Sequence, residues 1–439
     1  MAAGLQARDE GLTENSWYVA SAPRTEHWPA LGTDIDTDVC VIGGGLAGLS
    51  AALDLRARGY RVAVLEAREM GWGASGRNGG QALVGLACDI EVIERQLGFE
   101  DARRVWDTTL EALDLIHERR SKHRIECDWQ SGYLSVAVSE RKTRDLHAWC
   151  EQIAQRYGFA QMRPFGADEV QDRIASPRFA GGAFDPVSGH LHPLKYTLGL
   201  ASAAAQAGAA LYEHTAAVRI ERGAAPVVHT RAADGSAGLV RCRHVLLAGN
   251  VYSEELVPEI SSRIMPVGTY IVASAPVGAE RARALIPSRA AVCDTNFVLD
   301  YFRFSHDDRM LFGGRVSYST VTPMNLAESM RRRMCAVFPQ LADVPIDHAW
   351  GGFVDITMNR APDFGRIGDN LWYLQGFSGH GLALTGMAGR LAAEAIAGQS
   401  ERFDVYARLR HHAFPGGRLL RTPALVLAMA WYRLRDLLG

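Results

Sequence analysis

The chain has 439 residues, a formal net charge of −2 and 48% hydrophobic residues. A chain of this length usually forms two domains with a sizeable core, and its near-neutral charge gives no reason to expect a nucleic-acid partner. The seven cysteines are scattered and include no C-x-x-C pair, which favours reduced thiols over disulfides. Residues 1–10 contain no apolar segment typical of a secretory signal. We therefore expect a cytoplasmic protein.

A glycine-rich turn follows the first apolar strand, which is predicted over residues 39–42. The strand ends at Gly43, where a side chain would block the tight turn into a helix from Ala47 to about Arg58. Gly45 lets backbone N–H groups approach a pyrophosphate, and Gly48 lets the helix pack closely against the strand. The amino terminus of the helix adds free N–H donors and a favourable dipole. This turn predicts a site for nucleotide phosphates.

The second strand of the same unit, predicted over residues 62–65, leads to an acid at Glu66. Its carboxylate can accept hydrogen bonds from both ribose hydroxyls, and an acid there disfavours the 2′-phosphate of NADP. The alternative is a glycine-rich turn that binds no nucleotide, but it leaves the order of strand, helix, strand and acid unexplained. The unit thus predicts a dinucleotide site of the Rossmann type.

A polar, glycine-rich segment over residues 71–81 favours FAD over NAD as the dinucleotide. Glycines at this density let the main chain pass close to a flat ring system. Arg77 is a candidate to hold phosphate or a substrate carboxylate, and Asn78 and Gln81 are candidates to donate hydrogen bonds to the flavin. The alternative is a flexible surface loop, although the segment lacks the charge run typical of a linker.

The remaining elements alternate between helical and extended patterns. We predict helices over residues 91–120, 194–207 and 382–397. We predict strands over residues 134–138, 245–250, 269–272, 297–304, 310–314 and 371–374. The strands between residues 264 and 349 are expected to form a sheet that covers the flavin.

These patterns predict an α/β fold of two domains. A Rossmann-like FAD-binding domain is expected to be discontinuous, over residues 37–90, 190–255 and 345–415. A substrate domain with a mixed, largely antiparallel sheet is expected over residues 91–189 and 256–344. Residues 1–36 form an N-terminal segment, and residues 416–439 form an apolar C-terminal tail.

The junction Gly376-Phe377-Ser378-Gly379-His380-Gly381-Leu382 is predicted to be a second cofactor contact. It joins a strand to a helix, and the amino terminus of that helix can stabilise negative charge that develops near the flavin N1–C2=O edge. His380 is a candidate catalytic residue. Its alternative role, which we favour, is to orient the loop or donate a hydrogen bond.

Further motifs extend over nearly the whole chain: Asn15-Ser16-Trp17-Tyr18, Asp185-Pro186-Val187-Ser188-Gly189-His190-Leu191-His192-Pro193, Leu311-Phe312-Gly313-Gly314-Arg315 and Pro415-Gly416-Gly417-Arg418-Leu419-Leu420-Arg421-Thr422-Pro423. With the two glycine-rich segments and the Gly376 junction, they resemble the amine-oxidising branch of the D-amino-acid oxidase-like flavoprotein superfamily. Within that branch the chain is most similar to the γ-glutamylputrescine oxidases, and members that oxidise pipecolate or other amines look similar.

The resemblance implies FAD as the cofactor. Sarcosine-oxidase relatives attach their flavin through a cysteine shortly before a Pro-Asp pair, whereas residues 355–363 contain none, so we expect noncovalent FAD. The predicted cofactor-binding residues are Gly43, Gly45, Leu46, Ala47, Gly48, Glu66, Ala67, Arg68, Gly73, Ala74, Ser75, Arg77, Asn78, Gly79, Gly80, Gln81, Val218, Ala248, Gly249, Gly376, Phe377, Ser378, Gly379, His380 and Gly381.

The expected activity is oxidation of an amine carbon by hydride transfer to flavin, which requires positioning more than an acid–base pair. The leading substrate is γ-glutamylputrescine or a related γ-glutamyl polyamine, with release of the aldehyde and ammonia and, with oxygen, hydrogen peroxide. The alternatives are oxidation of L-pipecolate or another secondary amino acid, and a flavoprotein dehydrogenase that passes electrons to a quinone or a partner. No Ser-His-Asp arrangement supports acyl transfer.

The predicted catalytic and substrate-contacting residues are His380, Tyr270, Tyr301, Arg315 and Trp350, with Phe297 and Phe302 as further aromatic candidates. An aromatic wall can hold an alkylamine chain, and Arg315 can bind a carboxylate. For each aromatic residue, a place in the sheet core is an equally good interpretation.

A metal site is not expected. His190 and His192 are spaced for one face of a strand, but no cysteine or acid motif completes a site, and His411-His412 has the same problem. Asp307-Asp308 fits a turn. The tail over residues 424–432 is apolar but shorter than the about 20 residues needed to cross a membrane, so we expect it to pack on its own chain or on a second copy, with membrane contact as the alternative.

Overall fold

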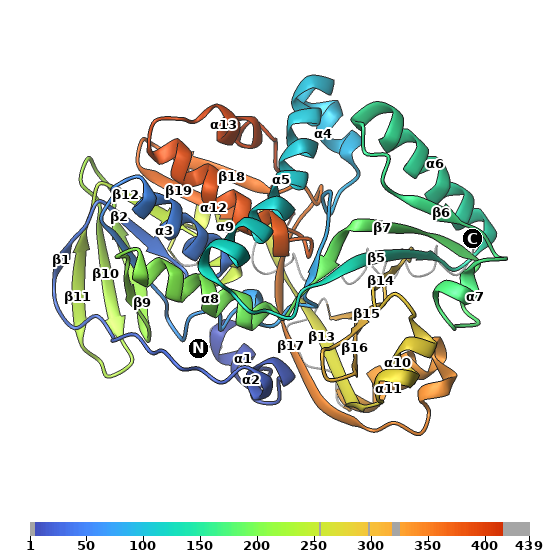
Figure 1. Cartoon of the computed structure of the whole chain (residues 1–439). Coiled ribbons are helices and arrows are strands. Elements are labelled where there is room, and N and C mark those ends of the chain that lie inside the picture. Colours follow the sequence, from blue (N-terminus) through green and yellow to red (C-terminus); the bar gives the residue numbers. More distant parts are fainter. Residues whose placement is uncertain (1–4, 254–255, 297–298, 318–324, 416–439) are drawn as a thin grey trace.

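The computed structural model describes residues 5–253, 256–296, 299–317 and 325–415 (Figure 1). Two large sheets organise this part of the chain, and helices cover them. The predicted α/β fold with two domains is confirmed. The C-terminal tail, Phe297 and the adjacent residue 298 lie outside the described residues.

The first sheet has six strands in the order β18-β19-β12-β2-β3-β8. Its strands are parallel except β18, which pairs antiparallel with β19. All side chains of β2, β3 and β19 are buried, as expected of a sheet that is covered on both faces. The strand bounds are β2 Val39–Ile42, β3 Val62–Leu65, β8 Ala210–Tyr212, β12 His244–Leu247, β18 Asp363–Ile367 and β19 Leu371–Gln375.

Helices cover one face of this sheet. Val41 and Val64 share a hydrophobic cluster with residues of α3 (Leu46–Ala57), α8 (Pro193–Gln206) and α12 (Leu382–Ile396). Because α3 and α12 begin at the same edge of the sheet, after β2 and after β19, their amino termini converge there.

A four-stranded sheet covers the other face, and the sequence analysis did not predict it. Cys40 and Leu65 pack against Val228 and Val240 of this sheet. Its order is β1-β11-β10-β9, with β1 Ile35–Asp36, β9 Thr215–Glu221, β10 Val227–Ala232 and β11 Ala237–Arg241.

The second large sheet is mixed and largely antiparallel, as predicted, because only β14 and β5 pair in parallel. Its nine strands include the order β17-β13-β16-β15-β14-β5-β7-β4, with β6 pairing β7. The bounds are β4 Gln81–Ala82, β5 Gln130–Ala137, β6 Arg163–Phe165, β7 Gly181–His190, β13 Ile264–Pro276, β14 Ala291–Asp294, β15 Tyr301–Phe304, β16 Arg309–Ser317 and β17 Ile346–Thr357.

Strand β17 differs from its predicted place in the cofactor domain. It pairs with β13 from Ile264 opposite Thr357 to Ser274 opposite Ile346, so it belongs to the nine-stranded sheet. The chain therefore passes directly from the second sheet to the first through residues 358–362. The other predicted domain boundaries stay predictions.

The predicted helix over residues 91–120 is two helices in the structure. Helix α4 spans Ile90–Leu97 and α5 spans Phe99–His123, and Gly98 between them has φ of +85°, which ends the first helix. The other helices are α1 Leu5–Glu10, α2 Trp17–Ser21, α6 Glu140–Tyr157, α7 Val170–Arg173, α9 Pro258–Ser261, α10 Ala279–Leu285, α11 Leu326–Val337 and α13 Glu401–Ala407.

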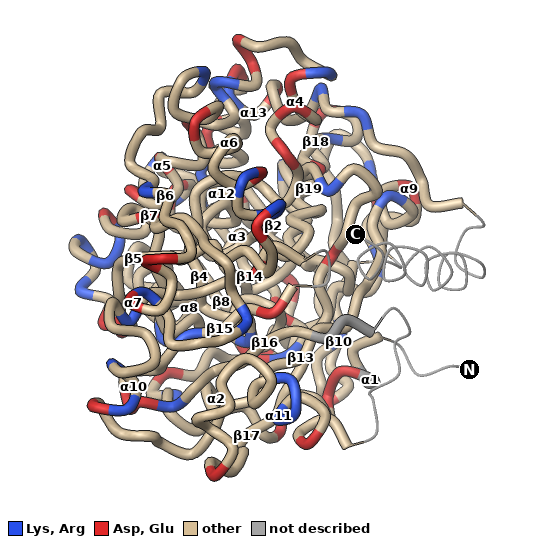
Figure 2. The backbone as a smooth tube through the Cα atoms, turned by 90° about the vertical axis from the view of Figure 1, so that its right-hand side faces the viewer, with Lys and Arg blue, Asp and Glu red and all other residues tan. Residues whose placement is uncertain are grey.

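In the view of Figure 2, basic and acidic positions are interspersed along the backbone. Within the described part of the chain, no helix is long and apolar enough to cross a membrane. All seven cysteines are free.

Candidate active site

The glycine turn after β2 leaves no room for side chains. Gly43 has φ of +116°, and a Cβ there would lie 2.5 Å from the carbonyl oxygen of Ala248. A Cβ at Gly48 would overlap the carbonyl oxygen of Gly43. The turn thus holds the start of α3 close to the ends of β2 and β12, as the fingerprint predicts.

The amino terminus of α3 faces a large cavity, to which Gly45, Leu46 and Ala47 contribute. The N–H of Leu46 donates to Ser75 Oγ at 2.9 Å, and a Cβ at Gly45 would lie 2.7 Å from the same oxygen. The helix therefore begins at the cavity, and the absence of a side chain at Gly45 leaves room beside its amino terminus, which suits a pyrophosphate.

Glu66 lies directly after β3 and stabilises this turn through hydrogen bonds. Its Oε2 accepts from the N–H of Gly44 at 2.8 Å, and its Oε1 accepts from the N–H of Arg68 at 3.0 Å. Burial raises the pKa of the Glu66 carboxyl. The predicted contact of this carboxylate with a ribose stays a prediction.

Arg77 has a structural role that the sequence analysis did not predict. Its guanidinium donates to both carboxylate oxygens of Asp9 in α1, at 3.1 and 2.6 Å, and to the carbonyl oxygen of Gly351 at 3.0 Å. It also donates to Tyr252 Oη at 3.3 Å and to the carbonyl oxygen of Gly73 at 3.3 Å. With its N–H donors engaged in this way, the expected role of Arg77 in binding a phosphate or a substrate carboxylate is not supported.

The side-chain amides of Asn78 and Gln81 form hydrogen bonds with backbone atoms of the loop and of β14. Asn78 Nδ2 donates to the carbonyl oxygen of Ala74 at 2.9 Å, and Asn78 Oδ1 accepts from the N–H of Gly80 at 2.8 Å. Gln81 Nε2 donates to the carbonyl oxygen of Val292 at 3.1 Å. Both residues line the cavity, and their predicted hydrogen bonds to flavin stay predictions.

Tyr301 lies where two glycines make room for its ring. A Cβ at Gly79 would lie 2.7 Å from Tyr301 Cε2, and a Cβ at Gly313 would overlap the ring. Tyr301 lines the cavity, and burial raises the pKa of its hydroxyl. The glycines at positions 79 and 313 therefore fix an aromatic wall between the loop and the second sheet.

Asp355 of β17 anchors the second loop of the site. Its buried carboxylate accepts from the N–H of Gly376 at 2.5 Å, and its carbonyl oxygen accepts from the N–H of Ser378 at 2.9 Å. Burial raises the pKa of Asp355 to about 7. Ser378 has φ of +54°, an uncommon conformation for a residue with a side chain, so this loop is held in one strained shape.

These segments surround one cavity of about 410 Å³, which is in the range of ligand sites. It lies between the converging amino termini of α3 and α12 and the second sheet. Predicted cofactor residues that line it are Gly45, Leu46, Ala47, Ala74, Ser75, Arg77, Asn78, Gly79, Gln81, Ala248, Phe377, Ser378, Gly379, His380 and Gly381. Lining residues that were not predicted include Tyr133, Asn250, Val267, Thr269, Ile271, Cys293, Asp355 and Arg360.

The other predicted cofactor residues do not form the cavity wall. Gly43, Gly48, Gly80 and Gly376 shape the turns behind it, and a Cβ at Gly376 would lie 2.6 Å from Thr357. Val218 is 44% exposed in β9 of the four-stranded sheet and does not line the cavity, so its predicted contact with the cofactor stays a prediction. The remaining members of this group are Glu66, Ala67, Arg68, Gly73 and Gly249.

Among the predicted catalytic residues, Tyr301 and His380 line the cavity, whereas Tyr270 and Trp350 do not. Side chains alternate along a strand, and Thr269 and Ile271 of β13 face the cavity, so the buried Tyr270 between them faces away. Trp350 is fully buried and its Nε1 donates to the carbonyl oxygen of Arg77 at 3.0 Å, so it supports the loop.

Phe302 and Arg315 are two further candidate residues in β15 and β16. Phe302 is fully buried and stacks on Phe312 with ring centroids 5.5 Å apart, which makes it a core residue. Arg315 lies in β16, and its side chain belongs to the part of the chain that is not described.

His380 is a half-buried imidazole with one ring nitrogen engaged. Its Nε2 lies 3.2 Å from the carbonyl oxygen of Val84 and donates to it, which leaves Nδ1 as an acceptor. Burial lowers the pKa of His380, so the ring is neutral near pH 7. Within the described residues, no hydrogen bond engages Nδ1.

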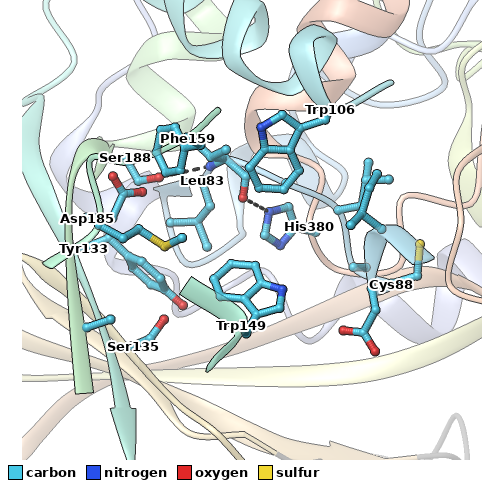
Figure 3. A pocket seen from close by; sticks show the side chains of 18 residues that line it. Leu83, Cys88, Trp106, Tyr133, Ser135, Trp149, Phe159, Asp185, Ser188 and His380 are labelled. Atoms are coloured by element: carbon cyan, nitrogen blue, oxygen red, sulfur yellow. Dashed lines mark hydrogen bonds between the residues drawn. The ribbon is translucent and has the colours of Figure 1, made fainter. Parts of the chain in front are cut away.

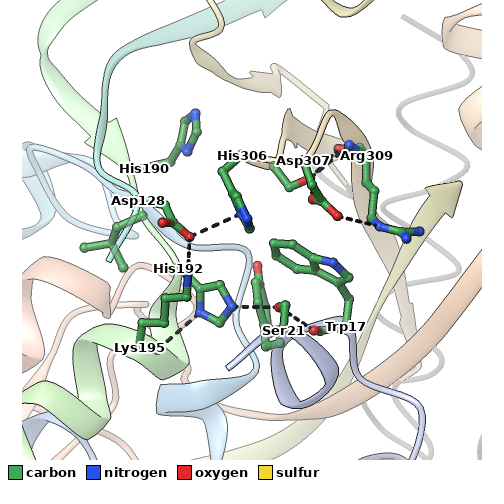
Figure 4. A network of polar contacts seen from close by, with 12 residues as sticks. Trp17, Ser21, Asp128, His190, His192, Lys195, His306, Asp307 and Arg309 are labelled. Carbon is green, nitrogen blue, oxygen red and sulfur yellow. Dashed lines mark hydrogen bonds and ion pairs between the residues drawn. The ribbon is translucent and has the colours of Figure 1, made fainter. Parts of the chain in front are cut away.

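His192 belongs to a polar network near α2, and His190 lies close to this network (Figure 4). The ring of His192 accepts from the N–H of Lys195 and bonds Ser21 Oγ at 3.0 Å, and burial lowers its pKa to about 2. His190 Nε2 bonds the carbonyl oxygen of Arg289 at 3.0 Å. The described residues contain no group of three or more His, Cys, Asp or Glu that could hold a metal ion.

The residues present fit FAD. Gly45 leaves the cavity free of a side chain at the start of α3, and the amino termini of α3 and α12 both face the cavity. The protein-family comparison decides the point, because the model for FAD dependent oxidoreductases matches residues 38–395.

The chain belongs to this family of FAD-dependent oxidoreductases. It is 40% identical to the gamma-glutamylputrescine oxidoreductase of Escherichia coli over 431 residues, which covers 98% of this chain and 100% of that protein. FAD is therefore the cofactor, and the protein is an FAD-dependent oxidoreductase.

Solved structures agree on the fold. The glycine oxidase of Geobacillus kaustophilus superposes with a TM-score of 0.71 at 21% identity, covering 86% of this chain and all of that chain. The L-proline dehydrogenase of P. horikoshii superposes with a TM-score of 0.68 at 20% identity, covering 84% of this chain and 94% of that chain. At these identities the likeness concerns the fold alone.

Proposed function

We propose that the protein oxidises the terminal amine of γ-glutamylputrescine or of a related γ-glutamyl polyamine. The observation that carries this proposal is the 40% identity over the full length to a gamma-glutamylputrescine oxidoreductase. The cavity supports it, because aromatic and aliphatic side chains such as Tyr133, Tyr301 and Ile271 line a space suited to an alkyl chain.

The reaction requires an uncharged amine held with its neighbouring C–H toward the flavin. When bound, FAD accepts a hydride from that carbon. The neutral His380 has Nδ1 available as an acceptor, and we assign it to receive a hydrogen bond from the substrate N–H. Tyr301 would hold the chain next to the amine, since its ring position is fixed by Gly79 and Gly313.

In this proposal the protein acts mainly by positioning the substrate, because the oxidation of an uncharged amine needs no acid–base dyad. The primary amine is converted to an imine, and water converts the imine to the aldehyde and ammonia. With oxygen as acceptor, one amine, one oxygen and one water give one aldehyde, one ammonia and one hydrogen peroxide. A quinone in place of oxygen would receive the same two electrons and two protons.

Several further features belong to the same proposal. FAD is held without a covalent bond, since residues 355–363 lack the cysteine through which the sarcosine-oxidase relatives attach their flavin. Arg315 binds a carboxylate of the substrate. The free cysteines fit a reducing cytoplasm, and the chain can form a homo-oligomer.

A turnover assay under air tests the proposal. The holoenzyme is given γ-glutamylputrescine, putrescine or L-pipecolate, and aldehyde, ammonia and hydrogen peroxide are quantified separately. We expect equal amounts of the three products from the γ-glutamyl amine. Turnover of L-pipecolate alone would contradict the proposal, whereas aldehyde without peroxide in the presence of a quinone would contradict only the choice of oxygen.

A further inference from the structure

Asp355 of β17 places a buried carboxylate in the wall of the cavity of about 410 Å³, which we call the flavin cavity. The residue is 3% exposed, and its Oδ2 accepts from the N–H of Gly376 at 2.5 Å. Among the described residues, no lysine, arginine or histidine forms an ion pair with it. The carboxylate thus has a hydrogen-bond donor but no countercharge, which makes its ionised form costly.

The position of Asp355 is at the ring end of the expected cofactor. The flavin cavity lies between the amino termini of α3 and α12 and the second large sheet, and Asp355 belongs to that sheet. A dinucleotide with its phosphates at the start of α3, beside Gly45, would place its flavin ring toward the second sheet. Asp355 and the Gly376 loop bound to it therefore lie beside the expected ring and away from the phosphates.

Several charged or titratable side chains lie on the elements around Asp355. Asp9 pairs with Arg77 at 2.6 Å, and Asp363 pairs with Arg263 at 3.5 Å, so both acids have a cation beside them. The other groups are an arginine, which stays charged, a histidine, and hydroxyl or thiol groups whose pKa is raised by burial. These are Arg360, His380, Tyr252, Tyr301 and Cys293.

His380 lies on the same loop but is poorly suited to hold a proton. Its imidazole stands between the flavin cavity and a smaller cavity of about 180 Å³, close to Trp106 and Trp149 (Figure 3). Its Nε2 donates to the carbonyl oxygen of Val84, and burial lowers its pKa, so the ring stays neutral near pH 7. Among these groups, Asp355 is therefore the better place for an added proton.

Reduction of the cofactor changes the charge beside Asp355. A hydride carries two electrons and one proton, so the flavin cavity gains one negative charge once the oxidised product has left. Burial raises the pKa of Asp355 to about 7, although N–H groups of the Gly376 loop act in the opposite direction. A second negative charge nearby raises this pKa further, because like charges disfavour the ionised form.

We propose that Asp355 takes up a proton from solvent when the bound FAD is reduced and releases it when the FAD is reoxidised. The carboxyl group thus offsets the negative charge that reduction adds to the flavin cavity. The inference rests on the membership of the FAD-dependent oxidoreductase family and is independent of which amine is oxidised.

Redox titration of the holoenzyme at several pH values tests the inference. Asp355→Asn keeps an acceptor for the N–H of Gly376 but cannot take up the proton. One additional proton changes the equilibrium constant of reduction tenfold per pH unit, which is about 30 mV for a two-electron couple. Above about pH 7 we expect the midpoint potential of the wild type to fall more steeply than that of Asp355→Asn, by up to this amount. Parallel lines for the two proteins would overturn the inference.

Asp185 provides the matched control. It is a buried carboxylate, 6% exposed, whose Oδ1 accepts from the N–H of Val187 at 2.9 Å. It lines the smaller cavity and not the flavin cavity. Asp185→Asn is expected to keep the wild-type dependence of the midpoint potential on pH. A flattened dependence in Asp185→Asn with none in Asp355→Asn would overturn the inference and assign the proton to Asp185.

Infrared difference spectroscopy of the wild type decides the inference if Asp355→Asn does not bind FAD. The holoenzyme, with aspartate isotope-labelled in its side-chain carboxyl group, is reduced electrochemically at about pH 8, where Asp355 is largely ionised before reduction. We expect a carboxylic-acid C=O band that appears on reduction, shifts with the label and persists in Asp185→Asn. Absence of this band would overturn the inference. Because no substrate is present, an enzyme that fails to oxidise γ-glutamylputrescine would contradict the proposed function and leave this result standing.

Discussion

The ion pair between Asp9 and Arg77 connects the N-terminal helix to the flavin loop. Its two side chains are 0% and 4% exposed, and their closest atoms are 2.6 Å apart. Asp9→Asn removes the negative charge and leaves a buried guanidinium without a countercharge. Breaking a buried pair on one side typically costs about 3–5 kcal/mol. We expect a loss of this size in the free energy of unfolding, measured by urea denaturation of the holoenzyme, together with weaker FAD binding because Arg77 positions the loop.

The next residue of the same helix provides the control. Glu10 pairs with Arg68 at 3.1 Å, but these side chains are 55% and 32% exposed. Exposed pairs contribute about 0–1 kcal/mol, so Glu10→Gln is expected to change the free energy of unfolding by less than about 1 kcal/mol. Equal effects of Asp9→Asn and Glu10→Gln, or an unchanged affinity for FAD in Asp9→Asn, would refute the structural role assigned to Arg77.

Three other predictions concern the cofactor site. Acid precipitation of the holoenzyme is expected to release the yellow colour into the supernatant, and colour retained on the protein would contradict noncovalent FAD. Burial raises the pKa of Asp355 from 3.8 to about 7, so folding binds a proton between these pH values. The contribution of Asp355 to the stability of the FAD-free protein should therefore fall as the pH rises from about 4 to about 7. The expected fall in the free energy of unfolding is of order 4 kcal/mol. Asp355→Asn should flatten the dependence of the urea midpoint on pH, and an unchanged slope in this variant would contradict the role of Asp355. Gly313→Ala should displace the ring of Tyr301 and lower kcat/KM at least about tenfold, and wild-type kinetics in this variant would remove Tyr301 from the wall.

The glycine turn that binds the cofactor can be predicted from local sequence. The glycines at 43, 45 and 48 are constrained by atoms of the same strand–helix unit and its neighbours, so their spacing alone indicates the turn. The Gly376 loop was predicted for the same reason. Its anchor at Asp355 was missed, because this contact joins residues of two different sheets.

Contacts between distant segments account for most of the differences. The pairing of Asp9 with Arg77 spans 68 positions and has no local signal, so the sequence analysis assigns Arg77 to a phosphate or a substrate carboxylate instead. Tyr270 was assigned to the site because the strand was recognised, but which of its two faces meets the cavity depends on the register with β17. In the four-stranded sheet only the pairing of β1 with β11, Ile35 opposite Val240, joins distant segments, whereas β9, β10 and β11 are consecutive antiparallel strands that the sequence analysis did not identify.

The most direct test of the proposed function is anaerobic reduction of the bound flavin, followed as loss of its visible absorbance in a stopped-flow instrument. γ-Glutamylputrescine, putrescine and L-pipecolate are mixed separately with the oxygen-free holoenzyme. Rapid bleaching by γ-glutamylputrescine, with far slower bleaching by the other two, is the expected result. Rapid bleaching by L-pipecolate with none by γ-glutamylputrescine would contradict it and assign the protein to the oxidation of cyclic amino acids.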